Sequence, residues 1–334
     1  MLNFQEKIWE PGEYCYEAAY GFEPDLYAYL HDDDSVRACM LVVPGGGYCM
    51  VCNVEGEPVV KEFFDRGMNA FVLTYTTDIT MSVPLKMQPA NDLSRAIRYI
   101  RANASRFHID PDRLSIAGFS AGGHLCASVA VHYDDIEDTN PKYAEISNRP
   151  DSFLLGYPVI STEDCTHRPS IEALLGKNPE KKELEYFSVD LNVNEKTPPC
   201  FLWQTVEDDL VPIENSALMA ESLRKRGIPY AYYAFPHGRH GLSACNDMVK
   251  SGEFGPPYTF RQLDLAIENV KNNTAINVSQ QRQDELMLQF FGTPEDTKDE
   301  QEPEQSTSTS QEFWDDVALW PQLAYEWLKS IKMV

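Results

Sequence analysis

The stretch Gly118-Phe119-Ser120-Ala121-Gly122 has the residue types that nucleophilic catalysis by a serine requires. It follows the apolar run 114–117 and precedes small residues that can continue as a helix. In a Gly-x-Ser-x-Gly turn the serine lies on a sharp strand-to-helix bend, and the glycines leave the necessary space. An ordinary glycine-rich turn is the alternative, because a five-residue match also arises by chance. The remaining chain must therefore show whether Ser120 has chemical partners.

Ser120 needs a base, because a serine hydroxyl is a weak nucleophile near neutral pH. In enzymes with this turn, the acid and then the histidine follow the serine along the chain. The loop after the apolar run 229–235 contains His237 and His240. We predict that His240, which precedes Gly241-Leu242, is the base, and we keep His237 as the alternative.

The base in turn needs a carboxylate that fixes its tautomer and stabilises its charged form. The loop after the apolar run 200–205 offers Glu207, Asp208 and Asp209. We predict Asp208 as the acid, because it stands three residues before Val211-Pro212, where a helix begins. Asp209 and Glu207 stay open as rivals, and so does a solvated acidic turn that only caps the next helix.

A glycine run, Gly45-Gly46-Gly47, directly follows the apolar run 38–43. Acyl transfer needs N–H donors for an oxyanion, and a backbone without side chains can approach the substrate closely. We predict that Gly46, Gly47 and Ala121 supply these donors. Tyr48 either lines the acyl pocket or packs under the loop. A phosphate-binding loop is disfavoured, since no Gly-Lys-Ser/Thr follows the glycines.

Strand-like and helix-like segments alternate along most of the chain. Expected strands lie at 38–43, 70–75, 114–119, 152–160, 200–205 and 229–235, and expected helices at 57–67, 92–105, 121–132, 214–226 and 320–331. This order predicts an α/β fold with a mostly parallel central sheet and helices on both faces, whose sites gather at the carboxyl ends of the strands. Two aromatic runs within 13–30 predict an opening antiparallel hairpin.

We expect residues 1–334 to form one domain, with an insertion at 246–312 before the last helix. Helical spacing recurs at 263–270, and a short helix is expected at 285–291. Residues 293–312 are polar and acidic, which predicts a mobile loop. The helical part around 258–271 is expected to cover the pocket mouth or to form an oligomer interface, so a homo-oligomer is left open.

Composition excludes several classes of function. The 334 residues include 28 Lys and Arg against 52 Asp and Glu, a net charge of −24, which repels phosphate backbones and anionic lipid. We therefore expect no nucleic-acid or membrane partner. The first residues lack the pattern of a signal peptide, and the eight cysteines are scattered, so we expect a cytoplasmic protein without a disulfide framework. We expect no metal and no cofactor, although Cys49 and Cys52 form a C-x-x-C.

Taken together, these motifs resemble the acetyl esterase and acetylxylan-esterase-like branch of the α/β-hydrolase superfamily. The matching stretches are Pro44-Gly45-Gly46-Gly47-Tyr48, Glu55-Gly56-Glu57-Pro58, Asp92-Leu93-Ser94-Arg95-Ala96-Ile97-Arg98, Asp110-Pro111-Asp112-Arg113-Leu114, 118–124, Tyr157-Pro158-Val159-Ile160, 174–179, Thr197-Pro198-Pro199, Asp208 with 211–216, and His240-Gly241-Leu242. The resemblance covers roughly residues 35–245 and resumes at 320–328.

The resemblance implies an α/β-hydrolase fold and ester hydrolysis through an acyl-enzyme. It implies Ser120 as nucleophile, Asp208 as acid and His240 as base, and it makes a small-molecule ester, such as an acetylated oligosaccharide, the expected substrate. The insertion at 246–312 is unusual among relatives. The missing secretion signal and the missing carbohydrate-binding module favour imported oligosaccharides or small esters over polymeric xylan. A peptidase, a thioesterase or a catalytically silent binding module stays open, because a triad does not identify the leaving group.

Overall fold

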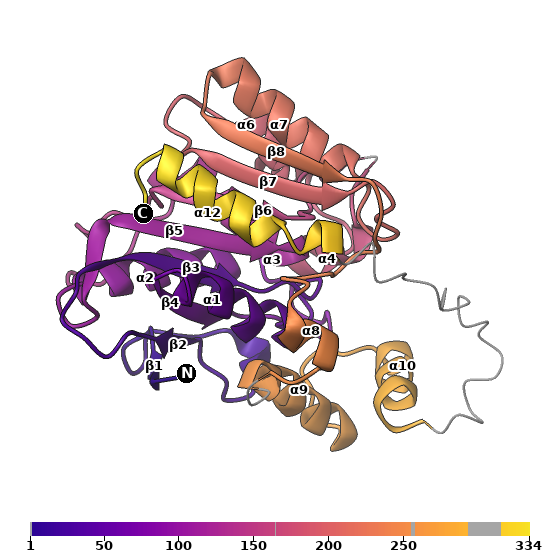
Figure 1. The fold of residues 1–334 in the computed structure, drawn as a ribbon. Helices are drawn as coiled ribbons and strands as arrows, with labels where there is room; N and C mark the ends of the chain where they lie inside the picture. Colours follow the sequence, from indigo (N-terminus) through magenta and orange to yellow (C-terminus); the bar gives the residue numbers. More distant parts are fainter. Residues whose placement is uncertain (1, 164, 255–257, 293–314) are drawn as a thin grey trace.

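In the computed structural model, which describes residues 2–163, 165–254, 258–292 and 315–334, the strands join one sheet (Figure 1). The strands are β1 Phe4–Lys7, β2 Asp25–Tyr29, β3 Arg37–Val43, β4 Asn69–Thr74, β5 Ile109–Phe119, β6 Ser152–Gly156, β7 Cys200–Thr205 and β8 Tyr230–Phe235. Their order is β1-β2-β4-β3-β5-β6-β7-β8. The pairs β1–β2 and β2–β4 are antiparallel and the other pairs are parallel.

Helices pack on both faces of this sheet. They are α1 Glu57–Phe64, α2 Gln88–Ala102, α3 Ser120–His132, α4 Arg168–Leu175, α5 Lys181–Phe187, α6 Val189–Asn192, α7 Glu214–Arg226, α8 Asp247–Ser251, α9 Arg261–Lys271, α10 Gln280–Phe291 and α12 Trp320–Ser330. The unbroken apolar run of β3 explains the two layers. Leu41 belongs to a core shared with α2, α3 and α7, whereas Met40 and Val42 belong to a core shared with α1 and α12. A strand covered on both faces is apolar at every position, as this one is.

The predicted hairpin within 13–30 is wrong. Its second run is β2, but β2 pairs with β1, and the first run contains the 3-10 helix η1 Glu17–Ala19. The aromatic side chains of that first run make tertiary contacts instead. The Tyr14 hydroxyl lies 2.9 Å from Thr76 Oγ1, and the Tyr16 hydroxyl donates to the Val83 carbonyl oxygen at 2.5 Å.

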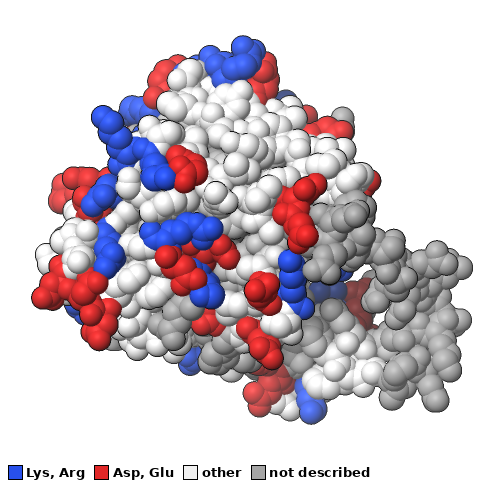
Figure 2. Space-filling model, viewed as in Figure 1, with Lys and Arg blue, Asp and Glu red and all other residues white. Residues whose placement is uncertain are grey.

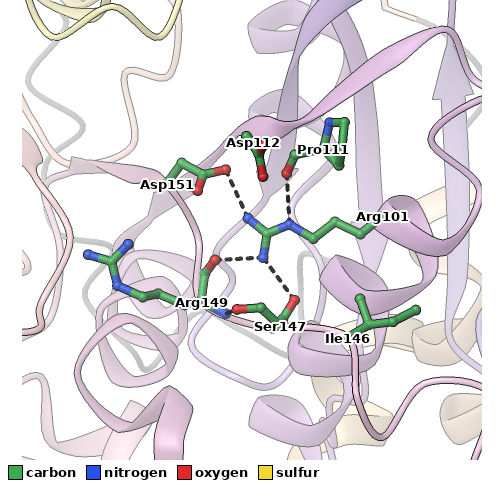
Figure 3. Close-up of a pocket in the computed structure, with 7 residues that line it drawn as sticks. All are labelled: Arg101, Pro111, Asp112, Ile146, Ser147, Arg149 and Asp151. Atoms are coloured by element: carbon green, nitrogen blue, oxygen red, sulfur yellow. Dashed lines mark hydrogen bonds and ion pairs between the residues drawn. The ribbon is translucent and has the colours of Figure 1, made fainter.

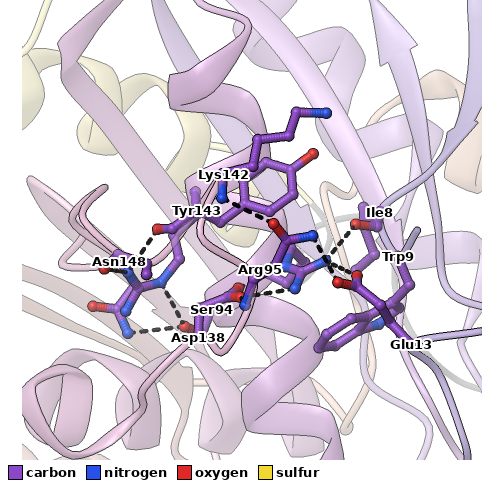
Figure 4. Close-up of polar contacts among 12 residues, drawn as sticks. Ile8, Trp9, Glu13, Ser94, Arg95, Asp138, Lys142, Tyr143 and Asn148 are labelled. Carbon is purple, nitrogen blue, oxygen red and sulfur yellow. Dashed lines mark hydrogen bonds and ion pairs between the residues drawn. The ribbon is translucent and has the colours of Figure 1, made fainter.

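Arg95 on α2 holds the segment between β1 and β2 in place (Figure 4). Its buried guanidinium pairs with Asp138 and Glu13, each at 2.6 Å, and lies over the Trp9 ring at 4.2 Å. A buried charge is tolerated when it is paired and hydrogen-bonded in this way. The contacts tie residues 9–13 to a helix rather than to a neighbouring strand.

Two helices of the predicted insertion, α9 and α10, pack on each other at the end of the sheet that holds β1 and β2 (Figure 1). The predicted helix near 263–270 is confirmed as α9, and the one near 285–291 is longer, because the Ser279 hydroxyl accepts from the Arg282 N–H and caps α10. Ile79, Leu263, Ile267 and Leu286 form a separate small core there. The predicted acidic loop 293–312 lies outside the described residues. That residues 1–334 form one domain stays a prediction.

Among the described residues, the sequence analysis missed the α-helices α4, α5, α6 and α8. They are only four to eight residues long, and such short helices give too few turns for an apolar period to be seen. On the face drawn in Figure 2, Lys and Arg side chains alternate with Asp and Glu among the described residues. That face therefore offers no continuous basic surface to a phosphate backbone.

Candidate active site

Ser120 lies at the bend between β5 and α3, as predicted, and its φ of 52° is in the left-handed region. A non-glycine residue there is strained, and such strain is typical of a nucleophile turn. A Cβ atom on Gly118 would lie 2.2 Å from the Gly122 carbonyl oxygen, and one on Gly122 would lie 2.2 Å from the Val43 carbonyl oxygen. Both glycines are therefore required so that the turn can pack against β3.

The structure brings Ser120, His240 and Asp208 into one hydrogen-bonded row. His240 Nε2 lies 2.9 Å from Ser120 Oγ, and His240 Nδ1 lies 2.9 and 3.0 Å from the two oxygens of Asp208. The Asp208 side chain is fully buried and the His240 side chain is 11% exposed. An ionised carboxylate accepts only, so Nδ1 carries the proton and Nε2 is free to accept the Ser120 hydroxyl proton.

The three neighbouring acids have different partners. Asp208 alone faces the imidazole, while Asp209 accepts the backbone N–H of His240 at 3.0 Å. Glu207 lies at the surface, 3.0 Å from Nδ1 of His237. The second acid thus shapes the loop, and the alternative histidine and the third acid pair with each other away from Ser120.

The glycine run passes directly against Ser120. A Cβ atom on Gly45 would lie 2.9 Å from Ser120 Cβ and 2.5 Å from the Phe119 carbonyl oxygen. None of the described residues accepts a hydrogen bond from the N–H of Gly46 or Gly47. Ala121 is the second residue of α3, and N–H groups in a first helical turn lack an intrahelical partner. Their service as oxyanion donors stays a prediction.

Tyr48 packs under the glycine run. Its side chain is 1% exposed, and its hydroxyl lies 2.8 Å from Nδ1 of His124. The Nε2 atom of His124 donates to the Phe187 carbonyl oxygen, so Nδ1 accepts from Tyr48. Burial lowers the pKa of His124 to about 4, which keeps this ring neutral at physiological pH. A contact between Tyr48 and substrate stays a prediction.

Comparison with known proteins places this chain in a family. The BD-FAE family model matches residues 25–223, more than half of the chain. The chain belongs to the BD-FAE family. Endo-1,4-beta-xylanase B of Butyrivibrio fibrisolvens is 59% identical over 262 residues, which are 78% of this chain and 41% of that protein. Acetylxylan esterase of Xylanibacter ruminicola is 30% identical over 226 residues, 65% of this chain and 43% of that protein. The chain thus spans less than half the length of these curated relatives.

Solved structures agree on the fold. The acetyl ester-xyloside bifunctional hydrolase from Caldicellulosiruptor lactoaceticus superposes with a TM-score of 0.68 at 36% identity, covering 81% of this chain and 97% of that one. The carboxylesterase Cest-2923 from Lactobacillus plantarum gives a TM-score of 0.66 at 21% identity, covering 100% and 99%. The fold of this BD-FAE member is the α/β-hydrolase fold, and the predicted resemblance is confirmed at that level.

The sequence analysis missed two residues beside this BD-FAE site, Glu55 and Tyr157. Glu55 ends the 3-10 helix η2 Asn53–Glu55 and is 3% exposed, and the Tyr157 ring lies edge-on to the His240 ring at 4.7 Å. Both residues occur in the stretches that carry the family resemblance. The available signal was a carboxylate, Glu55, between a glycine run and a helix, in the loop where strand ends meet.

A hollow of about 380 Å³ lies at the end of the sheet away from Ser120 (Figure 3). Its lining includes Asp112 near the start of β5 and Asp151 before β6, whereas Ser120 follows the end of β5. Arg101 donates there to three carbonyl oxygens and to Asp151. Its guanidinium is thus occupied by structural contacts rather than presented to an anion.

Within the described part of the chain, no group of three or more His, Cys, Asp or Glu side chains is arranged to hold a metal ion. Burial raises the pKa of Cys49 to about 11 and that of Cys52 to about 12. Both thiols are therefore protonated near neutral pH, whereas metal binding and redox exchange use the thiolate. None of the described helices is long and apolar enough to cross a membrane.

Proposed function

We propose that this BD-FAE member is a serine carboxylesterase that removes short acyl groups, above all acetyl, from sugars or similar small alcohols. The observation that carries the proposal is the row Ser120, His240 and Asp208, with 2.9 Å at both of its junctions. This row stands at a strained turn beside a glycine run. Such an arrangement activates a hydroxyl toward a carbonyl carbon.

The proposed reaction has two halves. Ser120 Oγ attacks the ester carbonyl while His240 Nε2 takes its proton, and the protonated ring then gives that proton to the departing alcohol. Asp208 stabilises the imidazolium. The N–H groups of Gly46, Gly47 and Ala121 bind the oxygen that becomes negative. Water attacks the resulting acyl-serine in the same way, which releases the acid and restores the serine.

The substrate class is argued from similarity. One relative is named an acetylxylan esterase, and a structural neighbour is titled an acetyl ester-xyloside hydrolase. A further relative is named an endo-1,4-beta-xylanase, of which this chain spans 41%. We therefore propose an acetylated xylo-oligosaccharide or a comparable sugar ester as the substrate.

Hydrolysis of p-nitrophenyl acetate by wild type and by Ser120→Ala tests the reaction. Ser128→Ala is the matched control, because it removes a buried hydroxyl without a described partner from the same helix. We expect Ser120→Ala to lose at least a thousandfold in kcat and to resist a fluorophosphonate label, while Ser128→Ala keeps both. Equal rates in Ser120→Ala and wild type would end the proposal.

The leaving group is tested separately. Acetyl, butyryl, thioacetyl and aminoacyl-amide substrates of one chromophore should give the highest kcat/KM for the acetyl ester. A preference for the thioester or the amide would instead identify a thioesterase or a peptidase. If wild type neither turns over any of them nor takes the label, a binding module remains.

A further inference from the structure

Glu55 is a buried carboxylate next to the proposed site. It is 3% exposed, and each of its carboxylate oxygens accepts a hydrogen bond. Oε2 accepts the backbone N–H of Gly45 at 2.6 Å, and Oε1 accepts the hydroxyl of Tyr157 at 2.7 Å. Burying a carboxylate is costly unless it is well hydrogen-bonded, so this placement requires a reason.

The two bonds reach two different loops of the site. Gly45 opens the glycine run, and a Cβ atom there would lie within 3.0 Å of both Ser120 Cβ and Glu55 Oε2. Tyr157 in turn accepts the backbone N–H of Ser243 at 3.0 Å, three residues after His240. The Tyr157 ring also lies edge-on to the His240 ring. One side chain thus connects the predicted oxyanion loop to the histidine loop.

The hydrogen-bond pattern fits the ionised form. Gly45 N–H can only donate, and the Tyr157 hydroxyl accepts from Ser243, so its own proton is left for Glu55. Burial raises the pKa of Glu55 above its ordinary value, and the hydrogen bonds from Tyr157 and Gly45 and the charge of His240 offset part of that rise. The neighbouring Cys52 and Tyr157 have raised pKa values and are neutral.

We propose that Glu55 is a positioning residue that holds the glycine run and the histidine loop together, and that its negative charge stabilises His240 in the protonated form. This inference rests on the proposed esterase function. It assigns the imidazolium two carboxylates, with Asp208 in direct contact and Glu55 acting across the Tyr157 ring.

Glu55→Gln removes the charge and keeps the shape of the side chain. The glutamine oxygen can accept from Gly45 while its amide donates to the Tyr157 hydroxyl, so the anion is lost and the bond to Tyr157 reverses its direction. The variant Tyr157→Phe shows separately what the Tyr157 hydroxyl contributes. Removing a negative charge disfavours protonated His240. We expect the acid limb of the kcat/KM profile to move down by about one pH unit and kcat to fall about tenfold. The other groups facing His240, namely Asp208, Asp209, His167 and Ser120, are unchanged.

Asp92→Asn is the matched control, because Asp92 is equally buried and accepts from Thr76, Gln88 and Trp9, none of them a site residue. It should lower the melting temperature and leave the acid limb within 0.3 units of wild type, a margin of about 0.4 kcal/mol. Tyr157→Phe keeps the carboxylate but breaks the link to Ser243, so kcat should fall about tenfold with little movement of the limb.

A wild-type kcat and acid limb in folded Glu55→Gln overturns the inference, and so does an equal shift in Asp92→Asn. If Glu55→Gln does not fold by circular dichroism, a wild-type kcat in Tyr157→Phe overturns it instead. The outcomes separate the two proposals. An active Ser120→Ala removes the esterase function, whereas an inactive Ser120→Ala with an unshifted Glu55→Gln removes only the role of Glu55.

Discussion

Replacing Asp208 by asparagine tests which atom of the proposed acid matters. Asp208 Oδ1 accepts the N–H groups of Leu210 and Val211 at 3.0 and 2.9 Å, so an asparagine must keep its oxygen there. Its amide nitrogen then takes the place of Oδ2, 2.9 Å from His240 Nδ1. Nδ1 also lies 3.0 Å from the retained oxygen, but an Nδ1–H would then face the new amide N–H at 2.9 Å. The amide therefore donates to Nδ1, and the ring proton moves to Nε2. A protonated Nε2 cannot accept the proton of Ser120.

The cost follows from that geometry. Turning the asparagine amide over would restore an acceptor to the ring, but it would leave two backbone N–H groups facing a donor, at about 1–3 kcal/mol each. The unturned amide opposes one donor besides the ring, the Gln204 Nε2 that lies 3.2 Å from Oδ2. The variant therefore keeps the wrong tautomer and also lacks the anion that stabilises the imidazolium. Changes of this kind in a serine triad lower kcat by about 10⁴, which is about 5.5 kcal/mol of barrier. We expect a loss of about 10³ to 10⁴ in kcat with little change in melting temperature.

Stopped-flow or steady-state kinetics with p-nitrophenyl acetate measure the effect, and active-site titration gives the concentration of active enzyme. Glu207→Gln should keep wild-type kcat, because Glu207 pairs with the exposed His237 and not with His240. Asp209→Asn keeps an oxygen for the His240 N–H and should lose less than tenfold. The reasoning is refuted if Asp208→Asn retains more than a tenth of kcat, or if either control loses as much.

Three further variants test the fold around the site. Gly122→Ala would place a Cβ atom 2.2 Å from a backbone oxygen, so the free energy of unfolding in urea should fall by several kcal/mol. Gly252 has open space and a φ of 70°, so Gly252→Ala should lower it by only about 1 kcal/mol. Similar losses in the two variants would contradict the packing argument. His124 has a pKa of about 4 when folded and about 6.5 when unfolded, so it contributes stability above pH 6.5 that is lost as pH falls toward 4. The difference in unfolding free energy between wild type and His124→Gln should therefore shrink by about 3 kcal/mol over that window. A constant difference would refute this. Leu286→Ala should lower the free energy of unfolding of the small core around α10 by about 2–5 kcal/mol and speed amide hydrogen exchange in that helix. Unchanged exchange would show that this core does not hold α10 in place.

Much of the sheet could be predicted because its strands are apolar on both sides. The runs 38–43 and 200–205 correspond to β3 and β7 within one residue at each end. The hairpin prediction failed because aromatic residues are common in strands and in loops that pack on a core. In this chain Tyr14 and Tyr16 use their hydroxyls on the loop after β4, which only the assembled structure reveals.

The candidate site divides in a similar way. Ser120 and His240 stand in loops with a motif, so their approach could be predicted from chain order alone. The choice among Glu207, Asp208 and Asp209 rested on their separation from Val211-Pro212 along the sequence. The sequence does not show toward which group each of three adjacent carboxylates points. Their separate partners follow from a tight turn in which two N–H groups bind Asp208 and orient it toward the ring.

Glu55 shows why the remainder could not be predicted. A glutamate in a loop is ordinarily solvated, and nothing in 53–58 indicates that this one is buried. Its burial depends on Gly45, Tyr157 and Ser243, which come from three loops, and the last of these is held by Trp320 Nε1 donating to the Ser243 carbonyl oxygen at 2.8 Å. Trp320 at the start of α12 thus helps to hold the histidine loop in place. Because the glycine run, the loop of Tyr157 and the histidine loop are joined through this carboxylate, the geometry of the site is a property of the closed fold rather than of any one motif.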